Sequence, residues 1–484
     1  MTQQNETKLL LISLLATLVL VAGGIWWFTN SENFGKSNGS NNSDSGNSGN
    51  LEPKENSEIV NKNTESKTSL TARISEGDKI LISGDGTQEK VSATAAIAKG
   101  NYTEAINYLQ NSLRAKGNDP EALIYLNNAR IGQTKSYTIV ASMPIGEELD
   151  AAQEMLRGVA QAQQEINQAG GINGIPIKIL IANDDNDPEI AEELAEEFVN
   201  NPNIFGVIGH FGSSVSLAAA EIYQANNLVM ISPTSTSVEL STVGNYIFRT
   251  VPSDRFAGSA LSRYTVNELK LQKAVVFFNS ESSYSKSLKD EYTTALFGDG
   301  GEVIAEYDLI DPNFNSASAV NDAIAKGAEV LMLAANSATL DQALQVVQVN
   351  DKRLPLLAGD SAYKAKTLQI GRSDAVGMIL AVPWHILADP DAEFPQAAGK
   401  LWGGEVNWRT ALAYDATQAL IAALKRNPSR SGVQQALSSG NFEARGASGD
   451  IRFLSSGDRN QAVQLVTIQP GSRTSFGYEF VPIP

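Results

Sequence analysis

Cysteine is absent from the 484-residue sequence, and histidine is nearly so. The lack of cysteine excludes disulfides, thiolate metal sites, a cysteine nucleophile and a lipid-modified cysteine after an N-terminal apolar segment. The two histidines, His210 and His385, are too few for a histidine-rich metal site. Basic residues are fewer than acidic ones, and the formal net charge is −17 at pH 7. Because a phosphate backbone requires a basic surface, no nucleic-acid partner is expected.

Sequence patterns for catalysis are missing as well. The two polar loops described below match neither the P-loop pattern nor the Gly-x-Ser-x-Gly pattern of a hydrolase elbow. The acidic run at 183–187 lacks the glycine and the distal glutamate of an EF-hand loop, and it fits the start of a helix better. His210 is interpreted as a structural residue, and no Ser, His and acid set has the spacing of a triad. We therefore expect no enzyme activity, no catalytic residue, no cofactor and no metal site.

A long uncharged run is present at residues 9–28. About 20 apolar residues cross a bilayer as a helix, whereas the core of a signal peptide takes about 7–15. Aromatic residues end the run, where their rings favour the membrane interface. We predict a membrane anchor at residues 1–30, with cleavage as a signal peptide after Gly24 as the alternative. Residues 31–90 are rich in Asn, Ser and Gly and are predicted to form a mostly disordered linker.

Helical spacing begins after the linker. Tyr102 and Ala105, followed by a helix start at 119–120, resemble one tetratricopeptide repeat with the beginning of another helix. One repeat cannot bury a continuous core alone, so we expect residues 91–135 to pack on the main domain or on a partner. A helical spacer and a partner-binding module both remain open for this unit.

From residue 136 onward, apolar runs alternate with amphipathic helical segments. This alternation predicts an α/β fold with parallel sheets and right-handed crossovers. About 350 residues exceed a single hydrophobic core, so two lobes are expected. Strands are predicted at 137–142, 175–182, 205–208, 228–231, 273–278, 302–307, 330–334, 356–358 and 378–382, with helices between them that include 154–169, 188–200 and 214–225.

Two polar loops follow neighbouring strands of the predicted first sheet, at 209–214 and 232–237. In open α/β sheets, ligands bind at the carboxyl ends of the strands. The first loop is rich in glycine and runs into a helix, whose free N–H groups can hold an anion. A tight turn with Ser213 as the N-cap of that helix is the alternative. The second loop is rich in hydroxyl groups, and the two loops together favour a ligand site.

The order of these segments resembles the leucine/isoleucine/valine-binding protein family. The resemblance runs from about residue 137 to the C-terminus. It implies a two-lobed type I periplasmic binding fold, in which three crossing strands join the lobes and a hinge closes them on the ligand. Lobe 1 is expected at about 136–253 and 384–448, and lobe 2 at about 254–383 and 449–484. The matching segments are EINQAGGINGIP, ANDDNDP, IGHFGSSVSLAAAEIY, LVMISPTSTSVEL, FRTVPSD, ESSYSKSL and SGDIRFLSSGD.

The resemblance implies binding roles for residues of both first-lobe loops. Ser213 and Thr236 occupy the places whose hydroxyl groups bind the α-carboxylate of the ligand, next to the helix start at Ser214. The backbone of Thr234 is the expected acceptor for the α-ammonium group, and Ser235 belongs to the same binding loop.

The resemblance also implies two contacts from the second lobe. Tyr284 is expected to reach across the cleft, although Ser285 replaces the usual glycine, and Asp360 is expected to pair with the ammonium group. The sequence departs from the family at 335–337, where an aromatic residue is usual, and in the first loop at 145–155. These departures leave a polar ligand, or one that is not an amino acid, open. The pair Trp384-His385 follows a predicted strand. Two alternatives are open for it, lining the cleft and packing at the hinge.

These features predict an extracytoplasmic solute-binding protein that captures an amino acid or a similar small molecule for an ABC importer. The chain contains no nucleotide-binding motif, so a separate permease and ATPase would be its partners. A membrane-tethered sensor ectodomain that passes ligand binding to a partner protein is the alternative.

Overall fold

The computed structural model describes residues 70–84 and 86–483. The predicted membrane anchor, and the predicted linker as far as residue 69, lie outside the described residues. None of the helices in the described ranges combines the length and the hydropathy needed to cross a bilayer.

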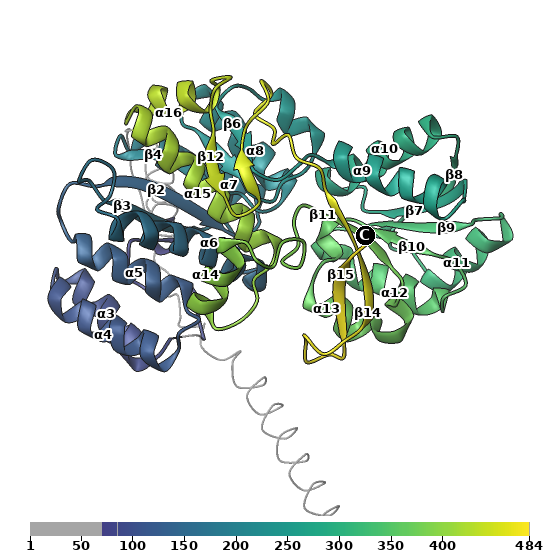
Figure 1. Cartoon of the computed structure of the whole chain (residues 1–484), viewed down its shortest axis with the longest axis horizontal. Coiled ribbons are helices and arrows are strands. Elements are labelled where there is room, and N and C mark those ends of the chain that lie inside the picture. The colour runs from purple at the N-terminus through teal and green to yellow at the C-terminus, as the bar shows by residue number, and fades with distance from the viewer. Residues whose placement is uncertain (1–69, 85, 484) are drawn as a thin grey trace, which may run out of the picture. The chain divides into compact units, whose positions relative to one another are not determined.

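The first lobe is built on a sheet with the strand order β1-β3-β2-β4-β5-β6 (Figure 1). All neighbouring strands are parallel except β1, which pairs antiparallel with β3. The strands are β1 (Ile74–Ser75), β2 (Tyr137–Met143), β3 (Ile177–Asn183), β4 (Ile204–Ile208), β5 (Met230–Ser232) and β6 (Ile247–Arg249). The helices of this lobe are α6 (Leu149–Gln168), α7 (Pro188–Asn200), α8 (Ser213–Ala225), α14 (Glu393–Trp402), α15 (Trp408–Arg426) and α16 (Arg430–Leu437).

The second lobe is built on a sheet with the strand order β15-β14-β11-β10-β9-β7-β8 (Figure 1). Strands β7 to β11 are parallel, and β14 and β15 form an antiparallel hairpin at the edge beside β11. The strands are β7 (Lys273–Phe278), β8 (Glu302–Asp308), β9 (Val330–Ala334), β10 (Leu356–Ala358), β11 (Ile379–Val382), β14 (Gln464–Pro470) and β15 (Tyr478–Pro482). The helices are α9 (Asp254–Arg263), the π-helix η3 (Tyr264–Glu268), α10 (Ser283–Gly298), α11 (Ser316–Ala325), α12 (Leu340–Asn350) and α13 (Ala365–Gly371).

The central strands are buried on both faces. Every residue of β9 is buried, and so are six of the seven residues of β2. A strand that is covered on both faces carries a continuous apolar run, which is why these strands could be located in the sequence. The predicted α/β fold with two lobes is therefore confirmed.

The chain passes between the two lobes three times, after β6, after β11 and after β13 (Gly449–Ile451). β13 pairs with β12 (Ala444–Gly446), which packs beside α15, so the chain leaves the first lobe after residue 451, and the predicted boundary was about 448. An ion pair joins the first and third passages, since Arg249 Nε lies 2.7 Å from Asp458 Oδ1. Arg249 also donates to the Ser237 carbonyl oxygen at 2.6 Å.

Several elements differ from the sequence-based expectation. Neither of the antiparallel additions, β1 and the β14–β15 hairpin, was predicted from the sequence. Residues 70–84 and 86–90 were assigned to the linker, but they contain β1 and the start of a helix, and β1 extends the first sheet. Helix α6 begins at Leu149, five residues before the predicted start at 154.

Three helices precede the first lobe: α3 (Gln88–Ala98), α4 (Tyr102–Ala115) and α5 (Pro120–Ile131). α3 and α4 form a hairpin, and α5 lies between α4 and the first lobe, where it contacts α6 and β3 (Figure 1). Eleven of the twelve residues of α5 are buried. The expected packing on the main domain is thus observed, and the resemblance to a tetratricopeptide repeat stays a prediction.

Asn128 of α5 ties this helix to the edge of the first sheet. Its amide nitrogen donates to the Ile179 carbonyl oxygen at 2.7 Å and to the Glu76 carbonyl oxygen at 3.0 Å. Its amide oxygen accepts from the Ile179 N–H at 3.2 Å and from Gln163 Nε2 at 2.9 Å. The side chain is only 3% exposed, so these hydrogen bonds replace water.

We expect Asn128→Ala to lower the free energy of unfolding by about 2–4 kcal/mol, because it leaves buried backbone groups without partners. Urea unfolding followed by circular dichroism measures the change. Asn111→Ala, at an exposed position of α4, is the matched control and should shift stability by less than about 0.5 kcal/mol. Equal unfolding midpoints for the two variants would show that α5 is not anchored in this way.

Candidate functional site

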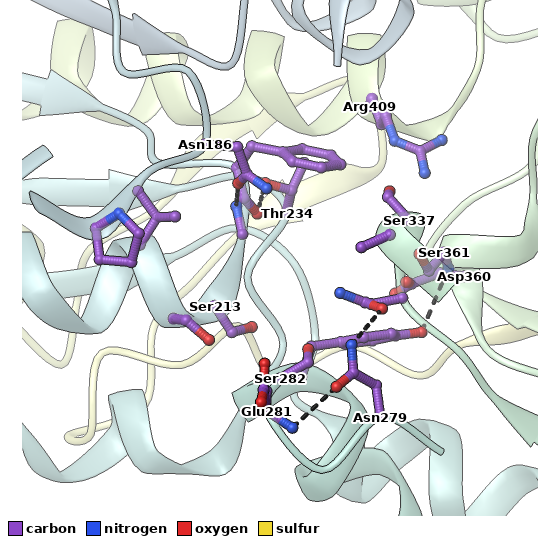
Figure 2. A pocket seen from close by; sticks show the side chains of 18 of the residues that line it. Asn186, Ser213, Thr234, Asn279, Glu281, Ser282, Ser337, Asp360, Ser361 and Arg409 are labelled. Atoms are coloured by element: carbon purple, nitrogen blue, oxygen red, sulfur yellow. Dashed lines mark hydrogen bonds between the residues drawn. The ribbon is translucent and has the colours of Figure 1, made fainter. Parts of the chain in front are cut away.

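A cavity of about 300 Å³ lies between the two lobes, where the carboxyl ends of strands from both sheets meet (Figure 2). Ser213 and Thr234 lie on one side of the cavity, and Ser337 and Asp360 lie on the other. Parallel strands end at the same edge of a sheet, which explains why loops distant in sequence meet here. Five of the seven predicted site residues line this cavity: Ser213, Ser214, Thr234, Tyr284 and Asp360.

The start of α8 forms one wall of the cavity. Gly212 is the N-cap residue and Ser213 is the first helical residue, so the alternative with Ser213 as the N-cap is wrong. No side chain of the described residues caps this helix, and its first N–H groups lie at the cavity wall with the positive end of the helix dipole. A Cβ at position 212 would lie 2.5 Å from Asn186 Oδ1, which accepts the Gly212 N–H at 3.1 Å. Only glycine allows this close approach.

The second polar loop contributes less to the cavity surface than predicted. Thr234 lines the cavity, and its hydroxyl donates to the Phe211 carbonyl oxygen at 2.9 Å. Ser235 and Thr236 do not line it, although both are buried. The Ser235 hydroxyl pairs with that of Ser216 at 2.7 Å, and Thr236 lies beside the carboxyl group of Asp254. In this arrangement Ser235 and Thr236 support the loop, and their direct contact with a ligand stays a prediction.

The acidic run before α7 is engaged in structural contacts. Asp184 is fully buried, and its carboxylate contacts His210 Nδ1 at 2.7 Å and the Ser142 hydroxyl at 3.0 Å. The other ring nitrogen of His210 lies 3.2 Å from the Tyr223 hydroxyl. Asp187 caps α7 by accepting from the backbone N–H groups of its first turn. His210 therefore fixes the loop from behind.

Tyr284 and Asp360 approach each other on the second lobe. The Tyr284 hydroxyl accepts the Ser361 N–H at 3.3 Å and lies beside the carboxyl group of Asp360. Gly359 makes this possible, because a Cβ there would lie 2.3 Å from the Tyr284 hydroxyl oxygen. The Ser285 hydroxyl, where the family has glycine, points inward and donates to the Ala334 carbonyl oxygen at 2.5 Å. This hydrogen bond joins the start of α10 to the end of β9.

Two buried carboxyl groups near the cavity have raised pKa values. Burial raises the pKa of Asp360 to about 6, against the opposing effects of Arg409 and of hydrogen bonds from Tyr284 and Ser361. Burial also raises the pKa of Asp254 to about 7, and the negative charge of Asp360 adds to this increase. A desolvated carboxylate gains from a cationic partner, so this wall of the cavity favours a positively charged ligand group.

The lobes contact each other around the cavity. The Ser283 N–H donates to the Ser214 hydroxyl oxygen at 3.2 Å, directly across the cleft. Lys364 Nζ lies 2.6 Å from Glu148 Oε2, which belongs to the first loop where the sequence departs from the family. These contacts join the two lobes beside the cavity.

Sequence reasoning missed several residues of the cavity. Trp408 and Arg409 begin α15, nearly 200 residues after Ser213, and lack a motif in the sequence. Asn279 and Asn336 are joined by a 3.1 Å hydrogen bond at the ends of β7 and β9. Their position after predicted strands could have indicated them. Phe211 and Gly212 lie in the predicted loop at 209–214, and Ser337 lies in the segment 335–337 noted above. The remaining missed lining residues are Asn186, Pro188, Val215, Glu281, Ser282, Ile310, Ala338 and Ser361.

Trp384 and His385 lie away from the cavity lining. His385 is 1% exposed, and its ring lies edge-on to Tyr363 with centroids 5.8 Å apart. Burial and the nearby Arg473 lower the pKa of His385 to about 4. Of the two alternatives for this pair, packing near a passage between the lobes is observed.

Fold and site together define a two-lobed α/β protein with a cavity of small-molecule size between its lobes. The family model for periplasmic binding proteins matches residues 146–473, which is more than half of the chain. The chain therefore belongs to the periplasmic binding protein family, a family of binding proteins.

Individual relatives agree with this assignment. An amino acid binding protein of Pseudomonas aeruginosa is 31% identical over 193 residues, 40% of this chain and 51% of that protein, so the match spans about half of that relative. The leucine-specific-binding protein of Salmonella typhimurium is 28% identical over 278 residues, 56% of this chain and 74% of that protein. The solved structure of a leucine binding protein from Thermotoga maritima has a TM-score of 0.63 at 21% identity, covering 71% of this chain and 97% of that one. The last likeness confirms the type I periplasmic binding fold.

The raised pKa of Asp254 predicts that the free energy of unfolding depends on pH. The folded protein holds this proton more tightly than the unfolded chain, so its stability should fall as the pH rises from about 4 to about 7. Asp254→Asn removes the titrating group and should therefore be more stable than the parent protein at pH 8, by about 1–3 kcal/mol. Urea unfolding at pH 5 and pH 8 measures this gain, which should shrink at the lower pH.

Asp290→Asn is the control for this experiment. Its side chain is 66% exposed, and removing its charge should change stability little at either pH. A gain for Asp254→Asn that does not depend on pH would contradict the assigned titration.

Proposed function

We propose that this chain is an extracytoplasmic solute-binding protein that captures an α-amino acid for an ABC importer. Membership of the periplasmic binding protein family supports an extracytoplasmic location and a binding role. The relatives named above, which are amino acid and leucine binding proteins, support the ligand class. A permease and an ATPase are the partners that this role requires.

The observation that carries the proposal is that one wall of the cavity attracts negative charge and the facing wall attracts positive charge. The uncapped start of α8 offers N–H groups and a positive partial charge, which suit a carboxylate. Asp360 and Tyr284 face it from the second lobe, and the desolvated carboxyl group of Asp360 suits an ammonium ion. An α-amino acid carries both charges on neighbouring atoms, so it complements the two walls at once.

Enclosure of the ligand strengthens these contacts. Charge-assisted hydrogen bonds gain strength where the local dielectric is low, and the contacts between the lobes hold the two walls of the cavity together. Binding across the lobes also couples the ligand to their relative position, which a permease can recognise. The importer role is preferred over the sensor alternative because the relatives are solute-binding proteins. Anchoring by residues 1–30 stays a prediction.

Isothermal titration calorimetry with L-α-amino acids tests the proposal. We expect at least one amino acid to bind, and Asp360→Asn to weaken its affinity by about 100-fold, because the ammonium ion loses its buried counter-charge. Asp341→Asn is a matched control, since its side chain is 60% exposed on the same lobe, and it should leave affinity unchanged. The proposal fails if no amino acid binds, or if both variants behave like the parent protein.

The same carboxyl group predicts how binding depends on pH. Asp360 must lose its proton to pair with an ammonium ion, and its pKa is about 6 in the free protein. Affinity should be constant above about pH 7 and fall as the pH drops below about 6, by up to about tenfold per pH unit. Asp360→Asn should abolish this dependence, whereas Asp254→Asn should retain it. A flat profile for the parent protein would argue against Asp360 as the ammonium partner.

A further inference from the structure

Arg409 is a buried cation whose donors are largely unused. It is 3% exposed, lines the cavity and follows Trp408 in the first turn of α15. Its Nη1 donates to the Tyr363 carbonyl oxygen at 3.1 Å. Its Nε is buried and has no hydrogen-bond partner among the described residues. A guanidinium group has five N–H donors, so most of its capacity remains for a ligand.

Other buried cations of the described chain differ from Arg409 in this respect. Lys90 lies 2.9 Å from Asp119 Oδ2 and contacts a second carboxylate, Arg249 lies 2.7 Å from Asp458, and Arg459 lies 3.3 Å from Asp415. Each is as buried as Arg409, and each has a carboxylate within ion-pair distance. Within the described residues Arg409 has none, although burying an unpaired charge is costly.

Three acidic groups influence Arg409. Asp360 acts on its charge without an ion-pair contact, and the other two have partners of their own. Glu148 is paired with Lys364, and Glu154 contacts Arg157 and the Thr410 hydroxyl. The Arg409 side chain is held in place by packing, with its guanidinium carbon 4.3 Å from the Trp408 ring centroid and 6.0 Å from that of Phe211. Its orientation is therefore fixed by aromatic rings, and its donors remain open toward the cavity.

Ser337 provides a second donor next to Arg409. Figure 2 shows the Arg409 side chain extending toward Ser337, which lines the cavity from the second lobe. The Ser337 hydroxyl oxygen accepts from Lys364 Nζ at 2.7 Å. Its own proton is thus available to an acceptor in the cavity. Arg409 and Ser337 together form a corner of hydrogen-bond donors that is separate from the start of α8, and Lys364, paired with Glu148, holds Ser337 in place.

We propose that this corner binds a carboxylate on the side chain of the ligand, and that the protein selects acidic amino acids over aliphatic ones. This inference rests on the proposed function. Arg409 can form paired hydrogen bonds with a carboxylate, and the ion pair offsets the desolvation of both groups. An aliphatic side chain would exclude water from the guanidinium group and leave its remaining N–H donors without a partner. The charges of an acidic amino acid are then each matched. The start of α8 faces the α-carboxylate, Asp360 faces the ammonium group, and Arg409 faces the carboxylate of the ligand side chain.

Calorimetric titration of the full chain with L-glutamate, L-aspartate and L-leucine tests the inference. We expect glutamate or aspartate to bind at least about tenfold more tightly than leucine, since a site with a buried polar group discriminates against ligands that lack its partner. Arg409→Met should weaken binding of the acidic ligand by about 100-fold and leave leucine binding equal or stronger. Arg426→Met, an exposed position at the end of the same helix, should change neither affinity.

Two further variants guard against a folding defect. Arg409→Lys retains the charge without the paired geometry and should retain part of the preference. Ser337→Ala removes one donor and should weaken binding of the acidic ligand by about 3- to 10-fold, with leucine unaffected. The inference is overturned if leucine binds the parent protein as tightly as the acidic amino acids do. It is also overturned if Arg409→Met weakens both ligands equally, since Arg409 would then bind the group common to all amino acids. Failure of every amino acid to bind would instead overturn the proposed function itself.

Discussion

The parallel order of the strands is the constraint on which the site depends. Parallel strands joined by right-handed crossovers end at one edge of each sheet, so every polar loop that follows them meets the others there. In the first lobe this edge brings the α8 start at Ser213 next to Thr234. In the second lobe it brings Asn279, Asn336 and Asp360 together, at the ends of β7, β9 and β10. The antiparallel additions β1, β14 and β15 lie at sheet edges, where they leave this order unchanged.

The loops at this edge are supported from behind by groups that do not face the cavity. Asp184 and His210 hold the first loop, and Ser235 pairs with Ser216 under the second. Gly212 and Gly359 permit the close backbone approaches that position Asn186 and Tyr284. The supporting residues direct their hydrogen-bond donors and acceptors to each other. The groups at the cavity surface can therefore interact with a ligand. A rigid support of this kind reduces the entropy that binding would otherwise cost.

Much of the fold could be predicted because its strands are continuous apolar runs. The ranges of β7, β9 and β10 agree with the prediction, since burial on both faces leaves a clear signal. β14 and β15 were missed because they are half-exposed edge strands with a weak pattern. The loops containing Ser213 and Thr234 were found from their place after strands, whereas Asp360 was found through the resemblance to the leucine/isoleucine/valine-binding protein family. Arg409 was missed because its place in the cavity depends on how α15 packs, and a single arginine at a helix start has no signature.

Some polar groups at the cavity lack the partners that a buried polar group usually has. Asn128, far from it, satisfies both its donor and its acceptor, as a buried amide should. At the cavity, Trp408 Nε1 and Arg409 Nε are buried without partners among the described residues, and Asp360 holds a proton more tightly than a surface carboxyl group does. Such groups lower the stability of the free protein, and a ligand with complementary charges removes the penalty. Under the proposed function, the cavity groups match a ligand with a positive group at Asp360, a negative group at the start of α8 and an acceptor at Arg409.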